Sequence, residues 1–431
     1  MKKDIENNIF FLSVLFLPIF QFVSFFLWIL LLIFYIWKKE PLKFNVKLYW
    51  IYYLYFFLLF IPLLRSENIL EELNYFVVKS PLLLFPILIY PLINDFFIKR
   101  LKQVWVLTCF SACSISFLRA VIRYLNGHSI DCFYYTGYTA YLHPTYFTIL
   151  LNIGLLIMIE KLMSNSKAII PSTSEGLTNI NYLKSTNKIQ NLLSWISEEY
   201  SSLSTRKKTY LNYSLTLLFM FNIYLLSARL SQLAVIFSLA FFIFLAAKKW
   251  GRLMKSIFLG LVIILSLCII SFNSRFAQFK DIKFNIEKVD TSQSDKSFYN
   301  SARVRTILIE AGIDIFKKHP LLGTSFSSMK KEFKDYLDAH KYYYVSKHYV
   351  GSHTQYLESV IILGIPGLLL LLYMFFGSVI RFLSRGNFLA AAFFLIFIIN
   401  AFGEAVLSAS GILFFCIWAT VFDSGFTPKK E

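Results

Sequence analysis

Arginine residues at the ends of apolar segments are the first candidates for chemistry. Arg229 lies in a short polar turn between two apolar runs, and Arg119 and Arg123, four residues apart, end another run. An unpaired cation costs about 2.5–3.5 kcal/mol at the centre of a bilayer and less near its interface, so these residues need anionic partners. A guanidinium binds phosphate or diphosphate through a planar bidentate fork. The alternative, strongest for Arg119 and Arg123, is snorkelling to lipid phosphates.

Two more arginines begin a helical pattern in a long hydrophilic segment. Arg303 and Arg305 lie in a stretch whose apolar residues recur at helical spacing: Val304, Ile307, Leu308, Ala311 and Ile315. The spacing predicts an amphipathic helix. Its arginines are further candidates for diphosphate binding, with a solvated helix face as the alternative.

A histidine and a carboxylate lie where this hydrophilic segment returns to an apolar run. His353 is in the sequence Gly351-Ser352-His353-Thr354, and imidazole is the usual side chain for accepting a proton near neutral pH. A structural role is the alternative for a single histidine at such an interface. Glu358, about one helical turn deeper, is a carboxylate inside an apolar run and hence a functional candidate, with His353 or an arginine as its expected partner.

Several classes of chemistry lack their motifs in this chain. The sequence contains no GxxxxGK[ST], GxGxxG or HExxH motif and no Asp-x-Asp pair, which disfavours nucleotide-dependent chemistry. His340, His348 and His353 are separated by eight and five residues, and a five-residue step places two side chains about 140° apart on a helix. We therefore expect neither a metal nor a cofactor.

The amino-acid composition indicates whether these residues belong to a soluble or a membrane protein. Of the 431 residues, 57% are hydrophobic and 16% are charged, whereas soluble domains have about 45–50% and about 25%. The net charge of +18 resides mostly between the apolar segments, as in membrane proteins, so we exclude nucleic acid as a partner. The five cysteines show no paired spacing and predict neither disulfides nor a metal site. The chain is predicted to be a polytopic membrane protein.

The apolar runs predict the number of spans, since about 20 apolar residues cross the hydrocarbon core as a helix. The 29-residue run 9–37 is too long for one span, and lysines on both flanks place both of its ends on the cytoplasmic side. It is therefore expected to be a hairpin broken near Pro18 and residues 21–24. The other runs are 48–64, 77–93, 104–124, 145–159, 210–226, 233–247, 255–272, 356–380, 388–402 and 409–422. The expected fold is an all-α membrane protein with about twelve transmembrane helices and one large exported loop.

The distribution of cations orients these helices. Segments assigned to the inside carry 24 of the 43 Lys and Arg residues, and 14 more lie in residues 273–352. The outer helix ends and short outer segments carry only five, namely Arg65, Lys79, Arg119, Arg123 and Arg229. By the positive-inside rule both termini are cytoplasmic and residues 273–352 form the exported loop. The inner halves of the spans read as apolar, which argues against a transporter.

The predicted organisation has three parts. Residues 1–272 carry helices 1–9 and a cytoplasmic loop, 160–209, whose Ser, Thr, Asn and Lys content is typical of a flexible segment. Residues 273–352 are the exported loop, which is expected to fold over the outer face of the bundle. Residues 353–431 carry helices 10–12.

Three motifs in this order resemble a known family. His353-Thr354, nine residues, and then Gly364-Ile365-Pro366-Gly367 resembles the motif of bacterial O-antigen ligases, which is a His, a small polar residue, nine residues and Gly-x-x-Gly. Arg305, followed by His319-Pro320-Leu321-Leu322-Gly323, is similar to the Arg to Pro-Leu-x-Gly segment of the same superfamily, which also includes O-antigen polymerases. Upstream, Leu226-Ser227-Ala228-Arg229 is similar to its Ser-Arg turn, and the segment from Tyr141 to Tyr146, with His143, resembles one found in some relatives.

The sequence departs from the family pattern at a few positions. Thr354 stands where Asn, Ser or Gln is usual, and Ala228 separates Ser227 from Arg229. Ser325 replaces a second glycine, and Ile309 stands where an aromatic residue is common. These departures bear on the particular activity more than on the superfamily.

The resemblance implies a metal-independent glycosyltransferase of the bacterial inner membrane that takes a glycan from undecaprenyl diphosphate. It implies that His353 is catalytic and that Arg229, Arg305 and Arg303 bind the diphosphate. Glu358 is placed in support, together with three further residues: His143, Arg119 and Arg123. The acceptor is the lipid A core or another surface glycan in a ligase and a second lipid-linked repeat unit in a polymerase. A non-catalytic polysaccharide or lipid transporter is the alternative from another class.

Overall fold

The computed structural model describes residues 2–37, 45–139, 141–168, 205–246, 260, 301–349 and 351–425. The described residues form helices joined by short turns, with no strand among them. The N-terminal helices are α1 (Lys2–Phe16), α2 (Gln21–Trp37), α3 (Val46–Leu58), α4 (Phe60–Arg65), α5 (Ile69–Lys79), α6 (Pro81–Ile89), η1 (Tyr90–Leu92) and α7 (Asp95–Leu125). The middle ones are η2 (Ile130–Phe133), α8 (Tyr135–Tyr138), α9 (Pro144–Ala168), α11 (Thr205–Leu226) and α12 (Arg229–Ala246). The C-terminal ones are α15 (Ser301–Lys318), α16 (Phe326–Ala339), α17 (Tyr343–His348), α18 (Gln355–Leu372), η4 (Tyr373–Gly377), α19 (Ser378–Ser384), α20 (Phe388–Asn400) and α21 (Ala409–Ser424).

Long apolar helices make up most of the bundle. Seven helical stretches in the described residues are long and apolar enough to cross a membrane: Val46–Arg65, Ile69–Leu92, Asp95–Leu125, Pro144–Met163, Lys207–Leu226, Arg229–Ala246 and Gln355–Ser384. Shorter apolar helices are Gln21–Trp37, Phe388–Asn400 and Ser410–Ser424. The all-helical membrane fold predicted from the sequence agrees with these helices. The run 255–272 lies outside the described residues except for residue 260, so the count of twelve stays a prediction.

The first apolar run is broken in two, as predicted from its length. α1 ends at Phe16 and α2 begins at Gln21, with Pro18 in the turn between them. Proline has no N–H to continue a helix, which favours the break there. The two helices fold back on each other: Ser24 Oγ donates to Ser13 O at 2.7 Å, and Trp28 Nε1 donates to Ser13 Oγ at 2.7 Å.

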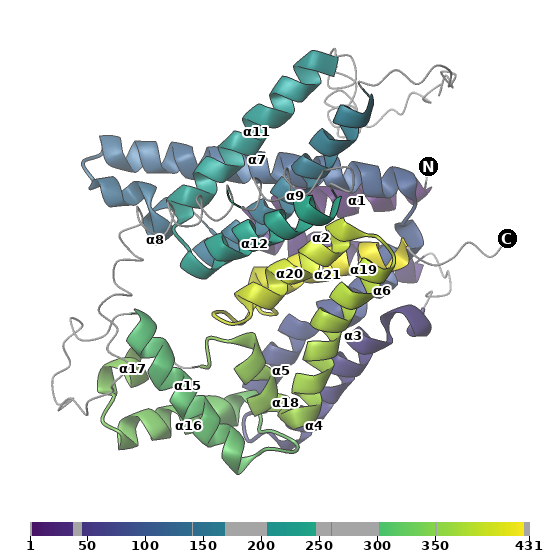
Figure 1. The fold of residues 1–431 in the computed structure, drawn as a ribbon. Helices are drawn as coiled ribbons and strands as arrows, with labels where there is room; N and C mark the ends of the chain where they lie inside the picture. Colours follow the sequence, from purple (N-terminus) through teal and green to yellow (C-terminus); the bar gives the residue numbers. More distant parts are fainter. Residues whose placement is uncertain are drawn as a thin grey trace.

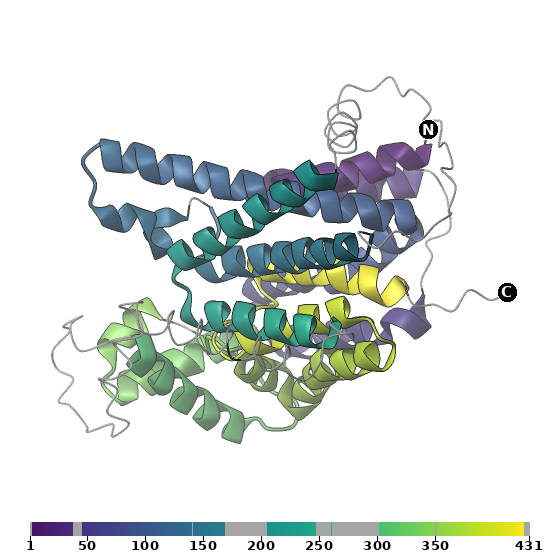
Figure 2. The same cartoon turned by 45° about the horizontal axis from the view of Figure 1, so that its top comes forward.

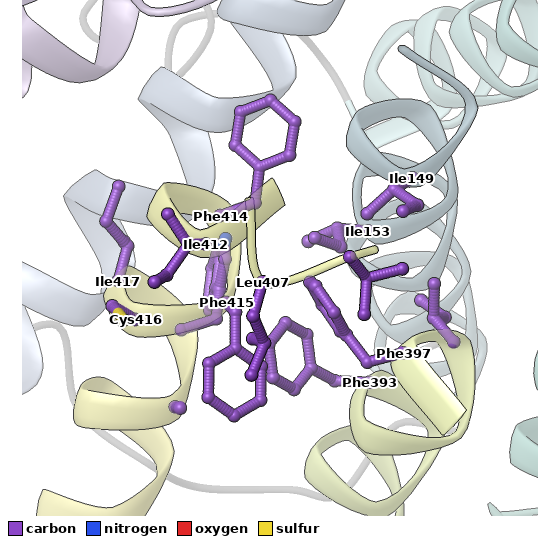
Figure 3. Packing of buried hydrophobic residues seen from close by; sticks show 14 of the residues in the cluster. Ile149, Ile153, Phe393, Phe397, Leu407, Ile412, Phe414, Phe415, Cys416 and Ile417 are labelled. Atoms are coloured by element: carbon purple, nitrogen blue, oxygen red, sulfur yellow. The ribbon is translucent and has the colours of Figure 1, made fainter. Parts of the chain in front are cut away.

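An aromatic core fills the centre of the bundle between α9, α20 and α21. Figure 3 shows Phe393 and Phe397 of α20 facing Phe415 of α21, with Ile149 and Ile153 of α9 beside them. The ring centroids of Phe397 and Phe415 are 5.1 Å apart, in an edge-to-face arrangement. Such pairs contribute about 0.5–1.5 kcal/mol beyond their burial. This packing fixes the depth of α20 and α21, whose connecting turn carries part of the site described below.

The helices α15, α16 and α17 form a small helical unit at one end of the bundle (Figures 1 and 2). α1 begins and α21 ends at the opposite end (Figure 1). The helix predicted from the apolar spacing after Arg303 is α15, and all five apolar residues of that pattern are buried. α16 attaches to the loop before α5 through Ser327 Oγ, 2.9 Å from Ser66 Oγ, and to α5 itself through an ion pair between Lys330 and Glu71.

A buried charge near the other end of the bundle corrects one expectation. Asp423 is fully buried, accepts a hydrogen bond from the Tyr52 hydroxyl at 2.7 Å and pairs with Arg381. The helix ends opposite α15–α17, which the predicted topology places on the inner side, are therefore not uniformly apolar. The three residues come from α3, α19 and α21, so the pair joins these helices where α20 and α21 leave the core.

Candidate functional site

The candidate site lies where four separate parts of the chain meet, at the end of the bundle next to α15. His143 directly precedes α9, Arg305 is in the second turn of α15, His353 precedes α18, and Glu404 lies in the turn between α20 and α21. Arg305 Nη2 is 3.6 Å from Glu404 Oε1, and Thr145 Oγ1 donates to the same oxygen at 3.4 Å. Residues far apart in the sequence, such as Thr145 and Glu404, which are 259 positions apart, thus contribute to one polar cluster.

The two histidines of the cluster are held in the neutral form. Burial lowers the pKa of His353, and the nearby Arg305 charge lowers it further, while the Glu358 carboxylate opposes them. Burial likewise lowers the pKa of His143, with contributions from His353 and Arg305. A neutral imidazole can accept a proton, so both rings are available as bases near pH 7.

Arg305 and Glu404 form a partly open ion pair. The Arg305 side chain is 41% exposed and that of Glu404 is 18% exposed. Burial raises the pKa of Glu404, and Arg305 and the Thr145 hydrogen bond offset part of this rise. The contact is long for a charge-assisted hydrogen bond, which is typically about 2.7–2.9 Å. Arg305 therefore retains donors that can face a second anion.

The backbone at His353 has a strained conformation. Its φ is +50°, a region that residues other than glycine seldom adopt. Neighbouring residues hold this geometry: Ser352 Oγ donates to Thr354 O at 3.0 Å, and Thr354 Oγ1 accepts from Leu357 N at 3.1 Å as the N-cap of α18. Strain of this kind costs about 1–3 kcal/mol and persists where the surroundings enforce it.

Glu358 has a different partner from the ones expected. Its Oε1 accepts hydrogen bonds from Lys79 Nζ at 3.1 Å and from the Tyr75 hydroxyl at 2.9 Å. The expectation of His353 or an arginine is therefore wrong for its direct contacts. The cation distribution groups Lys79 with the outer cations, and no spacing rule pairs it with Glu358, 279 positions away.

The glycines of the two late motifs bring the segment 320–324 and α18 together. Gly323 and Gly364 both have positive φ, of +64° and +66°. Thr324 N donates to Ile361 O at 2.7 Å and Ile365 N donates to Pro320 O at 2.9 Å, so the segment 320–324 lies against a kink in α18. A Cβ on Gly323 would come within 2.5 Å of Ile362 C and O.

The two glycines of the Gly-x-x-Gly motif have different surroundings. The backbone of Leu321 and Gly323 occupies the space beside Gly364, whereas Gly367 lies against the Leu363 side chain of its own helix. Gly364 therefore positions the segment 320–324 relative to α18.

The structure places the remaining arginines in three ways. Arg229 is the first residue of α12. The side chain of the next residue, Leu230, packs against Gly403, where an added Cβ would come within 2.6 Å of it. Gly403 directly precedes Glu404 in the sequence. Arg303 is two positions before Arg305, and residues at this spacing do not face each other on a helix. Arg119 and Arg123 donate to the backbone carbonyls of Thr139 and Gly137, respectively, the latter at 3.1 Å. Both thus hold the η2–α8 segment onto α7.

Sequence reasoning missed Glu404, Thr145, Tyr75 and the pairing of Lys79. Glu404 had a weak signal, because it is a carboxylate at the outer end of an apolar run. In the described part of the chain, His, Cys, Asp and Glu residues form no group of three or more that could hold a metal ion.

A comparison with protein families agrees with the motifs. Residues 214–372 match the family described as O-antigen ligase. Over these residues the chain is similar to O-antigen ligases. The match confirms the resemblance to the superfamily of O-antigen ligases and polymerases that the motifs predicted. A comparison with curated proteins gives no match.

The O-antigen ligase region contains only part of the polar cluster. Arg229, Arg305, His353 and Glu358 lie inside it, whereas His143 and Glu404 lie outside. The helices before and after the O-antigen ligase region therefore complete the cluster.

Proposed function

We propose that this protein is a glycosyltransferase of the O-antigen ligase type, which moves a glycan from undecaprenyl diphosphate to the lipid A core or to another surface glycan. The observation that carries the proposal is that the buried His353 lies near Arg305, which is 3.6 Å from Glu404, at one end of an apolar bundle. A base for a hydroxyl and a donor for a diphosphate are the two groups that such a transfer needs. The family match supports the same class of reaction.

In the proposed reaction, Arg305 and Arg229 bind the diphosphate of the donor. Their guanidinium groups stabilise the negative charge that develops on the leaving diphosphate as the anomeric C–O bond breaks. His353 accepts the proton of the acceptor hydroxyl as the new C–O bond forms, a contribution typically worth 10²–10⁴-fold. Arg303, His143, Arg119 and Arg123 have supporting roles, the last two by holding the η2–α8 segment. Because the diphosphate is already an activated leaving group, no nucleotide, metal or other cofactor is required.

The depth of the cluster suits a substrate anchored in the membrane. α20 has 13 residues and α21 has 16, which correspond to about 20 and 24 Å of helix against about 30 Å of hydrocarbon. Helices of this length do not cross the full hydrocarbon thickness, and we infer that the turn that carries Glu404 is recessed from the face of the bundle next to α15. We place this face on the exported side of the inner membrane, with both termini in the cytoplasm, because of the cation distribution.

Analysis of surface glycans in a deletion strain tests the proposal. A ligase predicts that complete polymer accumulates on the lipid carrier and is missing from the acceptor. A polymerase, which uses the same class of donor, predicts single repeat units attached to the acceptor. A normal surface glycan profile would exclude both, and glycan retained on the cytoplasmic side would favour the transporter.

A further inference from the structure

A second charged group lies directly below the cluster and has no part in the proposed reaction. Lys79, at the end of α5, has no exposed side-chain surface. Its Nζ lies 3.1 Å from Glu358 Oε1 and donates to Leu407 O at 2.6 Å. The Tyr75 ring lies 4.7 Å from the same nitrogen, and its hydroxyl donates to Glu358 at 2.9 Å.

These contacts join the elements that carry the reacting groups. Glu358 is five residues after His353, and Leu407 is three residues after Glu404. Gln355 makes a parallel connection, because its backbone N donates to Ala401 O at 2.9 Å and its Oε1 accepts from Leu407 N at 2.8 Å. Lys79, at the end of α5, thus contacts both the first turn of α18 and the α20–α21 turn.

The connection extends to the exported unit. The Tyr75 ring stacks on Phe326 of α16, with centroids 4.3 Å apart and an interplanar angle of 17°. Through Tyr75, the Glu358 carboxylate is therefore linked to the helical unit that also contains Arg305.

A buried ion pair is a costly way to hold helices together. Removing two charges from water has a penalty of several kcal/mol per ion, and a well-packed apolar pair is often equally or more stabilising. Stability alone therefore does not account for a charged pair at this point. The geometry offers another account, since Lys79 can hold both an oxygen of Glu358 and the carbonyl of the opposite turn, which no apolar side chain can do.

We propose that Lys79 and Glu358 are positioning residues that set the placement of His353 relative to the Arg305–Glu404 pair. This inference rests on the proposed function. Neither residue contacts the substrate; Lys79 acts through the backbone of Leu407, and Glu358 acts through the first turn of α18 and through its charge.

The charge of Glu358 provides a readout that a purely structural role does not move. The charged and titratable groups near His353 include Arg305 with its partner Glu404, His143, Glu358 and Tyr349, whose ring centroid is 5.9 Å from that of His353. Among the groups that shift the pKa of His353, Glu358 is the one that raises it and so favours the protonated ring. Without its carboxylate the pKa of His353 falls further, so the acid limb of the rate profile moves to lower pH.

The test compares two double variants in purified, reconstituted protein. Lys79→Met with Glu358→Gln removes both charges below the cluster while the amide can still accept from Tyr75. Arg381→Met with Asp423→Asn is the control and removes an ion pair at the opposite end of the bundle in which Asp423 is buried and Arg381 is 30% exposed. The donor is lipid-linked glycan extracted from a strain that lacks the gene, and kcat, KM and the pH profile of kcat/KM are measured together with the melting temperature.

We expect the Lys79/Glu358 double variant to lose at least tenfold in kcat, because misplacement of a reacting group by about 1 Å costs up to 10²-fold. Its acid limb should move to lower pH, and its melting temperature should resemble that of the control pair. The control should keep kcat within about twofold and the wild-type pH profile. The single Glu358→Gln variant should show the same direction of pH shift.

Three results would overturn the inference. The first is a wild-type kcat and pH profile in the Lys79/Glu358 variant, and the second is an equal loss of kcat in the control. The third is failure of both Glu358 variants to fold while the control folds, which would make the ion pair a requirement for folding. A parallel His353→Ala variant separates this outcome from the proposed function. If His353→Ala turns over at the full rate, His353 is not the base and the proposed function is contradicted. If His353→Ala is inactive while the Lys79 and Glu358 variants are unaffected, only the positioning role is contradicted.

Discussion

At the scale of single residues, His353 is the side chain on which the proposed chemistry depends. His353→Ala should be expressed and inserted at near wild-type levels and should transfer little or no glycan. A catalytic side chain mainly affects turnover, whereas a structural one mainly affects stability. The measurement is a reconstituted transfer assay beside quantified protein in membranes. Turnover at the wild-type rate would falsify the assignment, and EDTA should leave the wild-type enzyme unaffected.

The pH dependence follows from the environment of the same residue. Burial and Arg305 both lower the pKa of His353 from its ordinary value of 6.5. The base is active when deprotonated, so kcat/KM should fall only as the pH drops through a value below 6.5. A profile of kcat/KM between pH 4 and pH 8 checks this. An acid limb centred above 6.5 would mean that a different group titrates.

Arg305 and Arg229 can be tested by a substitution that keeps the charge. If each guanidinium binds the diphosphate through two hydrogen bonds, Arg305→Lys and Arg229→Lys should lose most of the activity, because an ammonium cannot reproduce the planar fork. Arg100→Lys, at the start of α7 and far along that helix from Arg119, is the control and should transfer glycan normally. Wild-type activity in the two site variants would leave these residues as lipid anchors.

The sequence identified only some residues of the cluster. His353, Arg305 and His143 are brought together as the motifs suggested. Glu404 and the Lys79–Glu358 pair were not foreseen, because their partners are far apart in the sequence and no spacing rule connects them. Arg119 and Arg123 were read as phosphate or lipid ligands, but their donors reach backbone carbonyls, which sequence cannot show.

At the scale of elements, the docking of the segment 320–324 on α18 depends on two glycines. Gly364→Ala should disrupt this contact, since the new Cβ would meet the Leu321 backbone and the positive φ is itself unfavourable. Gly386 is a matched control, because its φ is +71° but nothing lies within 4 Å of its Cβ. Gly386→Ala should lower the free energy of unfolding by only about 1–2 kcal/mol, the cost of the left-handed conformation.

The difference between the two variants isolates the close contact. We expect Gly364→Ala to transfer less glycan than Gly386→Ala and to show faster proteolysis of α15–α17 by an added protease. Equal behaviour of the two variants would mean that backbone conformation, and not docking, is what Gly364 supplies.

Helix positions were predicted better than helix contacts. The apolar runs and the break at Pro18 follow from hydrophobicity and from the missing proline N–H, which are local properties. The kink at Gly364 was not predicted, because a glycine within an apolar run also fits close helix packing. Only the approach of a second backbone, from residues 320–324, explains its φ of +66°.

At the scale of the whole molecule, the number of membrane-spanning helices between two points of the chain decides whether those points lie on the same side of the membrane. An odd number places them on opposite sides. Three apolar stretches follow the exported unit, namely α18 to α19, α20 and α21, so the C-terminus should lie on the other side of the membrane from α15–α17. Figure 1 agrees, because α21 ends opposite this unit. Between residues 200 and 300 the described crossings are α11 and α12, and the run 255–272 would make a third.

A pair of reporter fusions therefore tests the one span that lies almost entirely outside the described residues. With three crossings, a reporter after residue 200 should be cytoplasmic and one near residue 300 should be exported, whereas two crossings would place both on the same side. A reporter at the C-terminus should be cytoplasmic in either case if α15–α17 face outward. If the reporters at residues 200 and 300 give the same side, the twelve-helix topology is wrong. The cation-rich loop 160–209 would then share a side with His353, which contradicts the orientation on which the lipid-linked donor depends.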